Sequence, residues 1–213
     1  MTIAGLLRLQ AWLSPAFPVG SFAYSHGIEW AVENGMVRNE RTAKDWIDDV
    51  LRHGTGRSDA ILLRHAHTAY DDTAALAGLA ELAVAIGPAR ERRVETSAQG
   101  EAFVRAAAPW HELPPLPYPV AVGALAGRSA IDVEVTASCY LQAFAANLIS
   151  AAVRLIPLGQ SGGLRALASL EPTILGITRE TREATLEEIG GCAFLSDIAA
   201  MRHETQYTRL FRS

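Results

Sequence analysis

Apolar residues recur along this chain at the three- and four-residue spacing of amphipathic helices. Residues 42–52 show the pattern most clearly, because Trp46, Ile47, Val50 and Leu51 would lie on one side of a helix. Glycine and proline interrupt the pattern at short intervals, which indicates turns between helices. The chain is therefore predicted to consist of helices joined by short connections.

Alternation typical of strands is rare. Residues 131–136, with the sequence IDVEVT, do alternate, but we expect them to begin a helix because a helical pattern follows. The sequence thus predicts an all-α protein, a single-domain bundle of about ten helices spanning residues 1–213, with residues 201–213 as a C-terminal tail. The helices are expected at residues 6–13, 22–34, 42–52, 60–70, 73–86, 89–108, 120–127, 133–155, 162–170, 172–185 and 192–200.

Composition narrows the class of protein. Apolar residues make up 49% of the chain and charged residues 20%, which is typical of a folded globular protein rather than a disordered one. The formal net charge of −4 argues against general nucleic-acid binding, which needs a basic surface to neutralise phosphates. The only cysteines, Cys139 and Cys192, are too few and too isolated for a disulfide framework or a zinc motif, so a cytoplasmic protein is expected.

The sequence does not predict membrane association. The N-terminal residues place Arg8 inside an apolar run and lack a basic first region, so we expect no signal peptide. The most hydrophobic long segment, residues 140–158, is interrupted by Gln142, Asn147 and Arg154, so no transmembrane helix is expected.

Motifs for catalysis or for a resident metal or cofactor are absent from the sequence. His65 and His67 lie two positions apart, and on a helix they would point in different directions. The glycine-rich loop 158–165 has no lysine to reach a phosphate, so a turn between helices is favoured. Ser25 and His26 are adjacent, diverge on a helix and lack the nucleophile elbow, so nucleophilic catalysis has little support. We therefore expect no catalytic site, no metal site and no cofactor.

Arg154 and Gln160 are polar residues in an apolar neighbourhood, and two interpretations stay open. The structural one is favoured: a buried arginine needs a partner, and Arg154 would connect two helices. The functional one is an exposed arginine and glutamine that act on a nucleotide bound to a partner, as an arginine finger and a water-orienting glutamine do.

The C-terminal residues 201–213 carry the most informative pattern. Tyr207, Leu210 and Phe211 would share one face of a helix, with arginines around them. Large apolar side chains beside arginines are typical of interface anchors. A terminal helix docked on its own core and a tail that orders against another protein are both compatible with this pattern.

Three segments resemble the UreF family of urease accessory proteins. They are residues 13–35 (LSPAFPVGSFAYSHGIEWAVENG), residues 147–167 (NLISAAVRLIPLGQSGGLRAL) and residues 201–213 (MRHETQYTRLFRS). The segments are long and occur in the same order as in the family, and the resemblance runs from about Leu6 to the C-terminus. It implies an all-α, dimeric protein without enzyme activity of its own.

The resemblance also implies partners and a partner-binding site. Family members bind the accessory protein UreD, also called UreH, and the pair recruits the GTPase UreG for nickel insertion into apo-urease. The family's partner-ordered tail maps here onto His203, Glu204, Gln206, Tyr207, Arg209, Leu210, Phe211 and Arg212. A weaker assignment places the dimer contact or the UreG-facing surface at Phe22, Tyr24, Ser25, His26 and Glu29.

Four functional hypotheses follow. The leading one is a non-catalytic scaffold that with UreD recruits and regulates UreG. The second is a strict GTPase-activating protein for UreG that uses Arg154 or a tail arginine. The third is a nickel-binding chaperone that uses His26, His203 or Cys192, and the fourth, a hydrolase using Ser25 and His26, has the least support.

Overall fold

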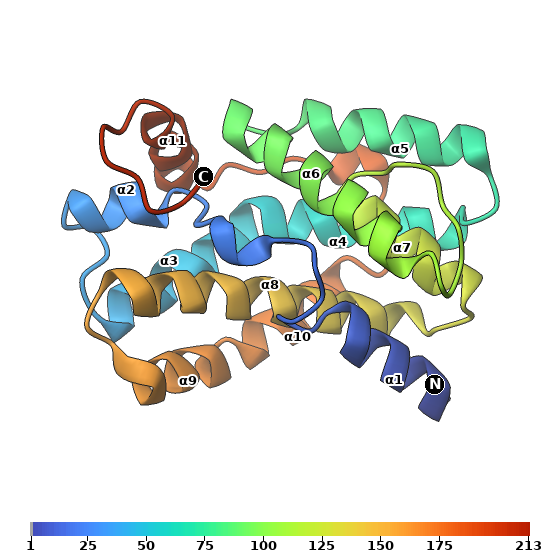
Figure 1. Ribbon diagram of the computed structural model, residues 1–213, viewed down its shortest axis with the longest axis horizontal. Coiled ribbons are helices and arrows are strands. Elements are labelled where there is room, and N and C mark those ends of the chain that lie inside the picture. The colour runs from blue at the N-terminus through green and yellow to red at the C-terminus, as the bar shows by residue number, and fades with distance from the viewer. Residues whose placement is uncertain (1) are drawn as a thin grey trace.

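The computed structural model describes residues 2–213, and all regular structure in that range is helical. Eleven α-helices and two short 3-10 helices form one domain, which confirms the predicted all-α bundle of about ten helices (Figure 1). The α-helices are α1 (Ile3–Trp12), α2 (Ile28–Glu33), α3 (Glu40–His53), α4 (Thr55–Thr68), α5 (Thr73–Ala85), α6 (Arg90–Ala107), α7 (Tyr118–Arg128), α8 (Val133–Leu155), α9 (Gly159–Ser169), α10 (Glu171–Glu180) and α11 (Phe194–His203). The 3-10 helices are η1 (Ser21–Ala23) and η2 (Leu186–Glu188).

Helices α4, α7 and α8 form the centre of the core. Most residues of α4 and α7 are buried, whereas α8 is partly buried. Helix α7 packs so closely on α4 that two positions of α7 have no room for a side chain. A Cβ atom on Gly123 would lie 2.2 Å from the carbonyl oxygen of Leu63, and one on Gly127 would lie 2.3 Å from that of His67. Glycine at these two positions therefore sets the distance between the two helix backbones.

Helix α8 begins where the sequence predicts, because Asp132 caps it. The side chain of Asp132 accepts a hydrogen bond from the backbone N–H of Val135 at 3.0 Å. The alternating residues 131–136 are thus a helix start and not a strand. Helix α8 has 23 residues, and its most apolar window of 18 residues has a mean hydropathy of 1.2, so α8 is long and apolar enough to cross a membrane. Half of this 18-residue window is, however, buried inside the fold. Packing against its neighbours in the core accounts for its apolar residues.

Two predicted helices are wrong in part. Residues 22–34 do not form one helix: η1 and α2 are separated by a break in which His26 and Gly27 have φ values of 55° and 76°. A Cβ on Gly27 would lie 2.7 Å from the backbone nitrogen of Ala200, so close packing on α11 requires glycine there. The helix predicted for residues 172–185 ends earlier, at Glu180.

The helical pattern of the C-terminal residues is also misleading. Helix α11 ends at His203, and the ten residues that follow contain no helix, so Tyr207, Leu210 and Phe211 do not share a helical face. Tyr207 and Leu210 are exposed, whereas Phe211 is buried. The reason is that the backbone N–H groups of Leu210 and Phe211 donate to the Glu29 carboxylate, and that of Arg212 donates to Ala23, rather than to a preceding helical turn.

Candidate functional site: the docked C-terminal segment

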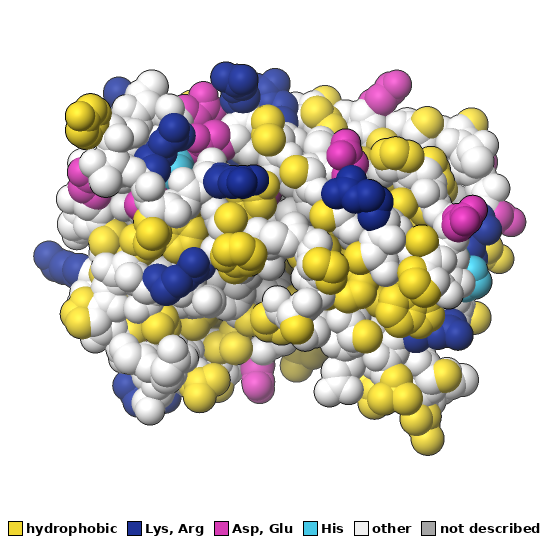
Figure 2. Space-filling view, in the orientation of Figure 1, with side chains coloured by type: hydrophobic (Ala, Val, Ile, Leu, Met, Phe, Trp, Pro, Cys, Tyr) yellow, Lys and Arg dark blue, Asp and Glu magenta, His cyan; other side chains and the backbone are white. Residues whose placement is uncertain are grey.

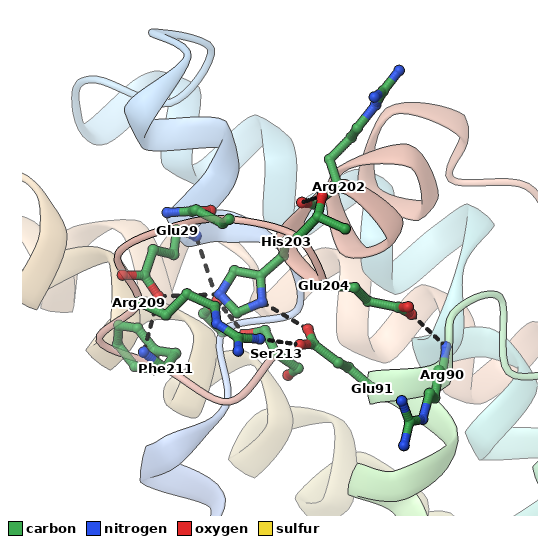
Figure 3. A network of polar contacts seen from close by, with 12 residues as sticks. Glu29, Arg90, Glu91, Arg202, His203, Glu204, Arg209, Phe211 and Ser213 are labelled. Atoms are coloured by element: carbon green, nitrogen blue, oxygen red, sulfur yellow. Dashed lines mark hydrogen bonds and ion pairs between the residues drawn. The ribbon is translucent and has the colours of Figure 1, made fainter.

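Residues 204–213, here called the C-terminal segment, fold back beside α2 and end next to α6 (Figure 1). They bring together two parts of the chain that carry predicted site residues, residues 22–29 and residues 201–213. Helix α6 supplies the third side of the arrangement. Figure 3 shows how side chains from α2, α6 and the C-terminal segment converge.

Glu29 on α2 anchors the C-terminal segment. Its carboxylate accepts hydrogen bonds from the backbone N–H of Leu210 at 2.6 Å and from that of Phe211 at 2.9 Å. It also lies 3.2 Å from Nε2 of His203. Because Glu29 is only 8% exposed, these partners replace the water that an ionised carboxylate would otherwise need.

His203 connects α2 to α6 through two carboxylates. Its Nδ1 lies 2.7 Å from Glu91, whose other oxygen accepts a hydrogen bond from Arg209 at 2.7 Å. The imidazole is completely buried, and both ring nitrogens face a carboxylate oxygen. His203 therefore lies between a carboxylate of α2 and one of α6 and connects the two helices. At the preceding residue, the first of α6, the backbone N–H of Arg90 donates to Glu204 at 2.7 Å, and this bond satisfies a helix-start amide that Ala89 cannot cap.

The last residues are held by the segment that precedes α2. The backbone N–H of Ser25 donates to the carbonyl oxygen of Ser213 at 2.7 Å, and that of Arg212 donates to Ala23 at 2.7 Å. The hydroxyl of Ser25 donates to the same Ser213 oxygen and not to His26, so no serine–histidine pair for catalysis exists. Both serines are completely buried.

A buried ionic cluster on α6 completes the docking site. The hydroxyl of Ser213 donates to Glu95 at 2.8 Å, and Glu95 is also ion-paired with Arg92 and lies 2.7 Å from Nε2 of His26. Burial alone would raise the pKa of Glu95, but the charge of Arg92 and the hydrogen bonds from His26 and Ser213 outweigh it and lower the pKa to about 2. Burial, assisted by the charge of Arg92, lowers the pKa of His26 to about 4.

The lowered pKa of His26 predicts a specific acid sensitivity. Between its ordinary value of 6.5 and about 4, the unfolded chain binds a proton that the folded chain does not, so the free energy of unfolding falls as the pH is lowered through this window. The His26→Asn variant removes the contribution of His26 to this pH dependence, and asparagine tolerates the positive φ of 55°. We expect the wild type to lose ~2 kcal/mol more than the variant between about pH 7 and pH 4.

Denaturant titrations at several pH values measure this difference. Asp59, whose pKa burial raises to about 7, contributes stability that is lost as the pH rises, so the comparison must be made between variant and wild type rather than on the wild type alone. His53→Asn, at an exposed position, is the matched control and should follow the wild type. Parallel curves for wild type and His26→Asn would contradict the assignment.

The outer side of the C-terminal segment faces solvent. Tyr207 is fully exposed and Leu210 is 65% exposed, whereas Phe211 points inward beneath Arg154, whose guanidinium lies 4.3 Å from the centre of the Phe211 ring. Gln206 is half-buried, and its amide donates to the carbonyl oxygen of Thr208 at 3.1 Å. Figure 2 shows this face of the molecule, where arginine side chains lie among apolar groups.

The other candidate residues divide into exposed and buried ones. Arg154 and Gln160 are exposed, so the premise of a buried arginine that connects two helices is wrong: Arg154 contacts the C-terminal segment instead. Of the candidates between residues 22 and 29, only Phe22 is exposed, at 68%. Tyr24, Ser25, His26 and Glu29 are buried within the same chain.

Sequence reasoning missed the acceptor side of the docking site on α6. Glu91, Glu95 and Gln99 are spaced four residues apart, so they form a polar stripe along one helix face, and Arg92 lies beside it. A polar stripe on a helix that must also pack against the core is the signal that would have revealed them.

No group of three or more potential metal-binding side chains occurs in the described part of the chain. His26 and His203, two of the proposed nickel ligands, already contact buried carboxylates.

Comparison with known proteins places the chain in a family. A family model described as UreF matches residues 37–171. The chain is 52% identical over 212 residues to a urease accessory protein UreF of Cereibacter sphaeroides, with 99% of each chain covered. It is 47% identical to the protein of the same name from Rhodopseudomonas palustris, covering 99% of this chain and 92% of the relative. It is also 47% identical to that of Mesorhizobium japonicum, covering 98% and 96%. With a family model that spans more than half of its length and relatives of this similarity along nearly all of it, the chain belongs to the UreF family of urease accessory proteins.

Proposed function

We propose that this chain is a non-catalytic scaffold in urease maturation. Together with the accessory protein UreD, or UreH, it recruits and regulates the GTPase UreG, so that nickel is inserted into apo-urease. It acts in the cytoplasm as a homodimer. The observation that carries this proposal is the C-terminal segment, whose backbone is held by the buried Glu29 carboxylate while Tyr207 and Leu210 point to solvent.

The docked C-terminal segment suits partner binding because it is already ordered before a partner arrives, which reduces the entropy lost on binding. A disordered tail loses backbone and side-chain freedom when it binds, and this loss weakens the complex. Here Glu29 and Glu91 already fix the positions of residues 209–211. A partner then meets an ordered surface with exposed Tyr207, Leu210 and Arg212. A complementary surface would combine an apolar pocket with carboxylates, which accept bidentate hydrogen bonds from arginine.

Replacing Tyr207 by alanine tests the proposed surface. Because the side chain is fully exposed, the substitution should leave the free energy of unfolding unchanged. We expect it to weaken binding to UreD by ~2 kcal/mol, as expected for an aromatic interface anchor. Isothermal titration of purified UreD with the full chain measures the affinity.

Leu175→Ala is the matched control, because Leu175 is an exposed leucine on α10 and is 54% exposed. It should bind UreD as the wild type does. Phe211→Ala is a different experiment: Phe211 is buried, so its loss should release the segment and lower stability as well as affinity. Wild-type affinity in both Tyr207→Ala and Leu210→Ala would refute the proposed surface.

A strict GTPase-activating role is the second candidate, and one observation favours it. Arg154 is exposed and rests on the Phe211 ring, and it forms no ion pair with any residue among 2–213. An arginine held in place but free of a carboxylate can be offered to a nucleotide on a partner. Single-turnover GTP hydrolysis by UreG, with and without this protein, tests the role. Arg154→Lys keeps the charge and removes the forked geometry, so loss of acceleration in this variant would support the candidate, and no acceleration by the wild type would remove it.

A further inference from the structure

Asp59 on α4 is a buried carboxyl group for which the partner-binding surface gives no role. It is 9% exposed, and its Oδ2 accepts a hydrogen bond from the hydroxyl of Tyr140 at 2.7 Å. Within residues 2–213 Asp59 forms no ion pair, and its carboxyl group has no hydrogen bond besides the one from Tyr140. A buried carboxylate without a cation costs far more free energy than a neutral carboxyl group does. The surroundings of Asp59 therefore favour its protonated form.

The charged groups around Asp59 compensate an ionised carboxylate only in part. Arg92 on α6 is the cation that acts on Asp59, but it is ion-paired with Glu95. The titratable and charged groups that face Asp59 are Arg92 and Glu95 of α6, Tyr118 of α7, Tyr140 of α8 and, in the wall of a shared cavity, Asp197 of α11. Burial raises the pKa of Asp59 to about 7, and the hydrogen bond from Tyr140 and the charge of Arg92 oppose this rise without cancelling it. Asp59 thus gains or loses its proton near neutral pH.

Helix α11 closes the space beside Asp59. A cavity of about 80 Å³ that Asp59 lines has walls from the starts of α4 and α6, the end of α5, the loop at Gly190 and Gly191, and Asp197 in the first turn of α11. The last residue of α11, His203, lies between Glu29 and Glu91 and leads directly into the C-terminal segment. Release of α11 together with this segment therefore opens one wall of the cavity and admits water to Asp59.

A chain of contacts also connects Asp59 to the end of the C-terminal segment. Arg92 lines the same cavity as Asp59 and is ion-paired with Glu95, and Glu95 accepts a hydrogen bond from the hydroxyl of Ser213 at 2.8 Å. An ionised Asp59 attracts Arg92 and so competes with Glu95 for its charge. Glu95 is only 3% exposed, so weaker pairing with Arg92 leaves a buried carboxylate that gains by hydration. Release of Ser213 is what lets water reach it.

We propose that Asp59 is a pH switch for the C-terminal segment: protonated Asp59 keeps α11 and the segment docked, and loss of the proton favours their release. The direction follows from linkage. Release hydrates Asp59, so its pKa is higher in the docked state than in the released state, and docking takes up a proton. Docking therefore weakens as the pH rises from the ordinary aspartate value of 3.8 towards about 7. The switch acts within this chain, so it stands independently of the proposed binding to UreD.

Hydrogen exchange of residues 204–213 in the full-length protein tests the switch. Asp59→Asn keeps an oxygen that accepts from Tyr140 but stays neutral at every pH. The ratio of the wild-type exchange rate to the Asp59→Asn rate removes the intrinsic pH dependence of exchange, because both proteins share the sequence of this segment. It also removes the titrations of His26 and Asp197, which are common to both. We expect this ratio to rise by ~10-fold or more between about pH 5 and pH 8, since one unit of difference between docked and released pKa corresponds to a factor of ten.

Tyr140→Phe is a second variant that keeps the test decisive if Asp59→Asn disturbs the core. It removes the hydroxyl that stabilises the ionised form of Asp59, so the pH at which the segment is released should move upward, a shift that a merely structural role does not produce. Asp71→Asn, at an exposed position, is the matched control and should follow the wild type at every pH. Circular dichroism checks the fold of each variant. A ratio that stays constant with pH for folded Asp59→Asn, or an unshifted profile for Tyr140→Phe, would overturn the switch.

Discussion

Replacing Glu29 by glutamine is expected to release the C-terminal segment and to lower the free energy of unfolding by ~3–5 kcal/mol, the range for breaking a buried charged network. The carboxylate of Glu29 accepts from two backbone N–H groups and faces His203. Glutamine has nearly the same shape but only one oxygen, so its NH₂ group would point at a donor. At least one buried N–H would then lose its partner, which costs free energy beyond the lost hydrogen bond.

Two measurements separate the local and the global effect of this substitution. Denaturant titration gives the free energy of unfolding, and hydrogen exchange of residues 204–213 reports release of the segment itself. Glu33→Gln is the matched control, because Glu33 is an exposed glutamate on the same helix. If Glu29→Gln kept wild-type stability and wild-type exchange, then Glu29 would not be the anchor of the segment. Binding to UreD should fall together with protection of the segment, since the proposed surface depends on its order.

Replacing Gly123 by alanine is expected to destabilise the core by ~3 kcal/mol, at the upper end of the range for overpacked cores. The added methyl group would lie 2.2 Å from the carbonyl oxygen of Leu63. That oxygen belongs to a helix backbone, so no side-chain rotation can make room, and α4 and α7 would have to separate. The change acts on the most extensive helix contact of the fold.

Gly78→Ala is the control, and its expected effect on stability has the opposite sign. Gly78 is an exposed residue of α5, and a Cβ there would meet no atom within 4 Å. Alanine should raise stability by ~1 kcal/mol through helix propensity alone. Thermal or denaturant unfolding of the two variants measures both effects. A Gly123→Ala variant as stable as the wild type would show that α4 and α7 can separate at little cost.

Much of the helical architecture could be predicted because its signals are local. The bounds of α8 match the expected residues 133–155, since Asp132 caps its start and Pro157 follows its end. The break in residues 22–34 could not be predicted in this way. Its backbone conformation depends on Gly27 packing against α11 and on Ser25 binding Ser213, contacts that join residues more than 170 positions apart.

The docking site shows a different limit of sequence reasoning. The spacing of Tyr207, Leu210 and Phe211 indicated a helix, but Glu29 offered the backbone of this segment a better set of acceptors than a helix would. The segment docks on its own chain, as one of the two open interpretations stated, although not as a helix. Contact with UreD stays a prediction. Removing everything after Ala200 would expose Glu29, Glu91 and Glu95 together with the face that the segment covers, so point substitutions test the role more cleanly than truncation.

The position of the C-terminal segment has a consequence for how the protein is made. Glu29, Glu91 and Glu95 leave the ribosome about a hundred or more residues before His203, Phe211 and Ser213 are synthesised. During that interval, which at typical elongation rates lasts roughly 5–20 s, the three carboxylates must remain hydrated and the site that receives Phe211 stays open. A nascent or prematurely terminated chain therefore exposes three carboxylates and the contact site of Phe211, which the finished protein covers. This difference distinguishes unfinished from finished molecules, and a chaperone or protease that recognises it would act only on the former.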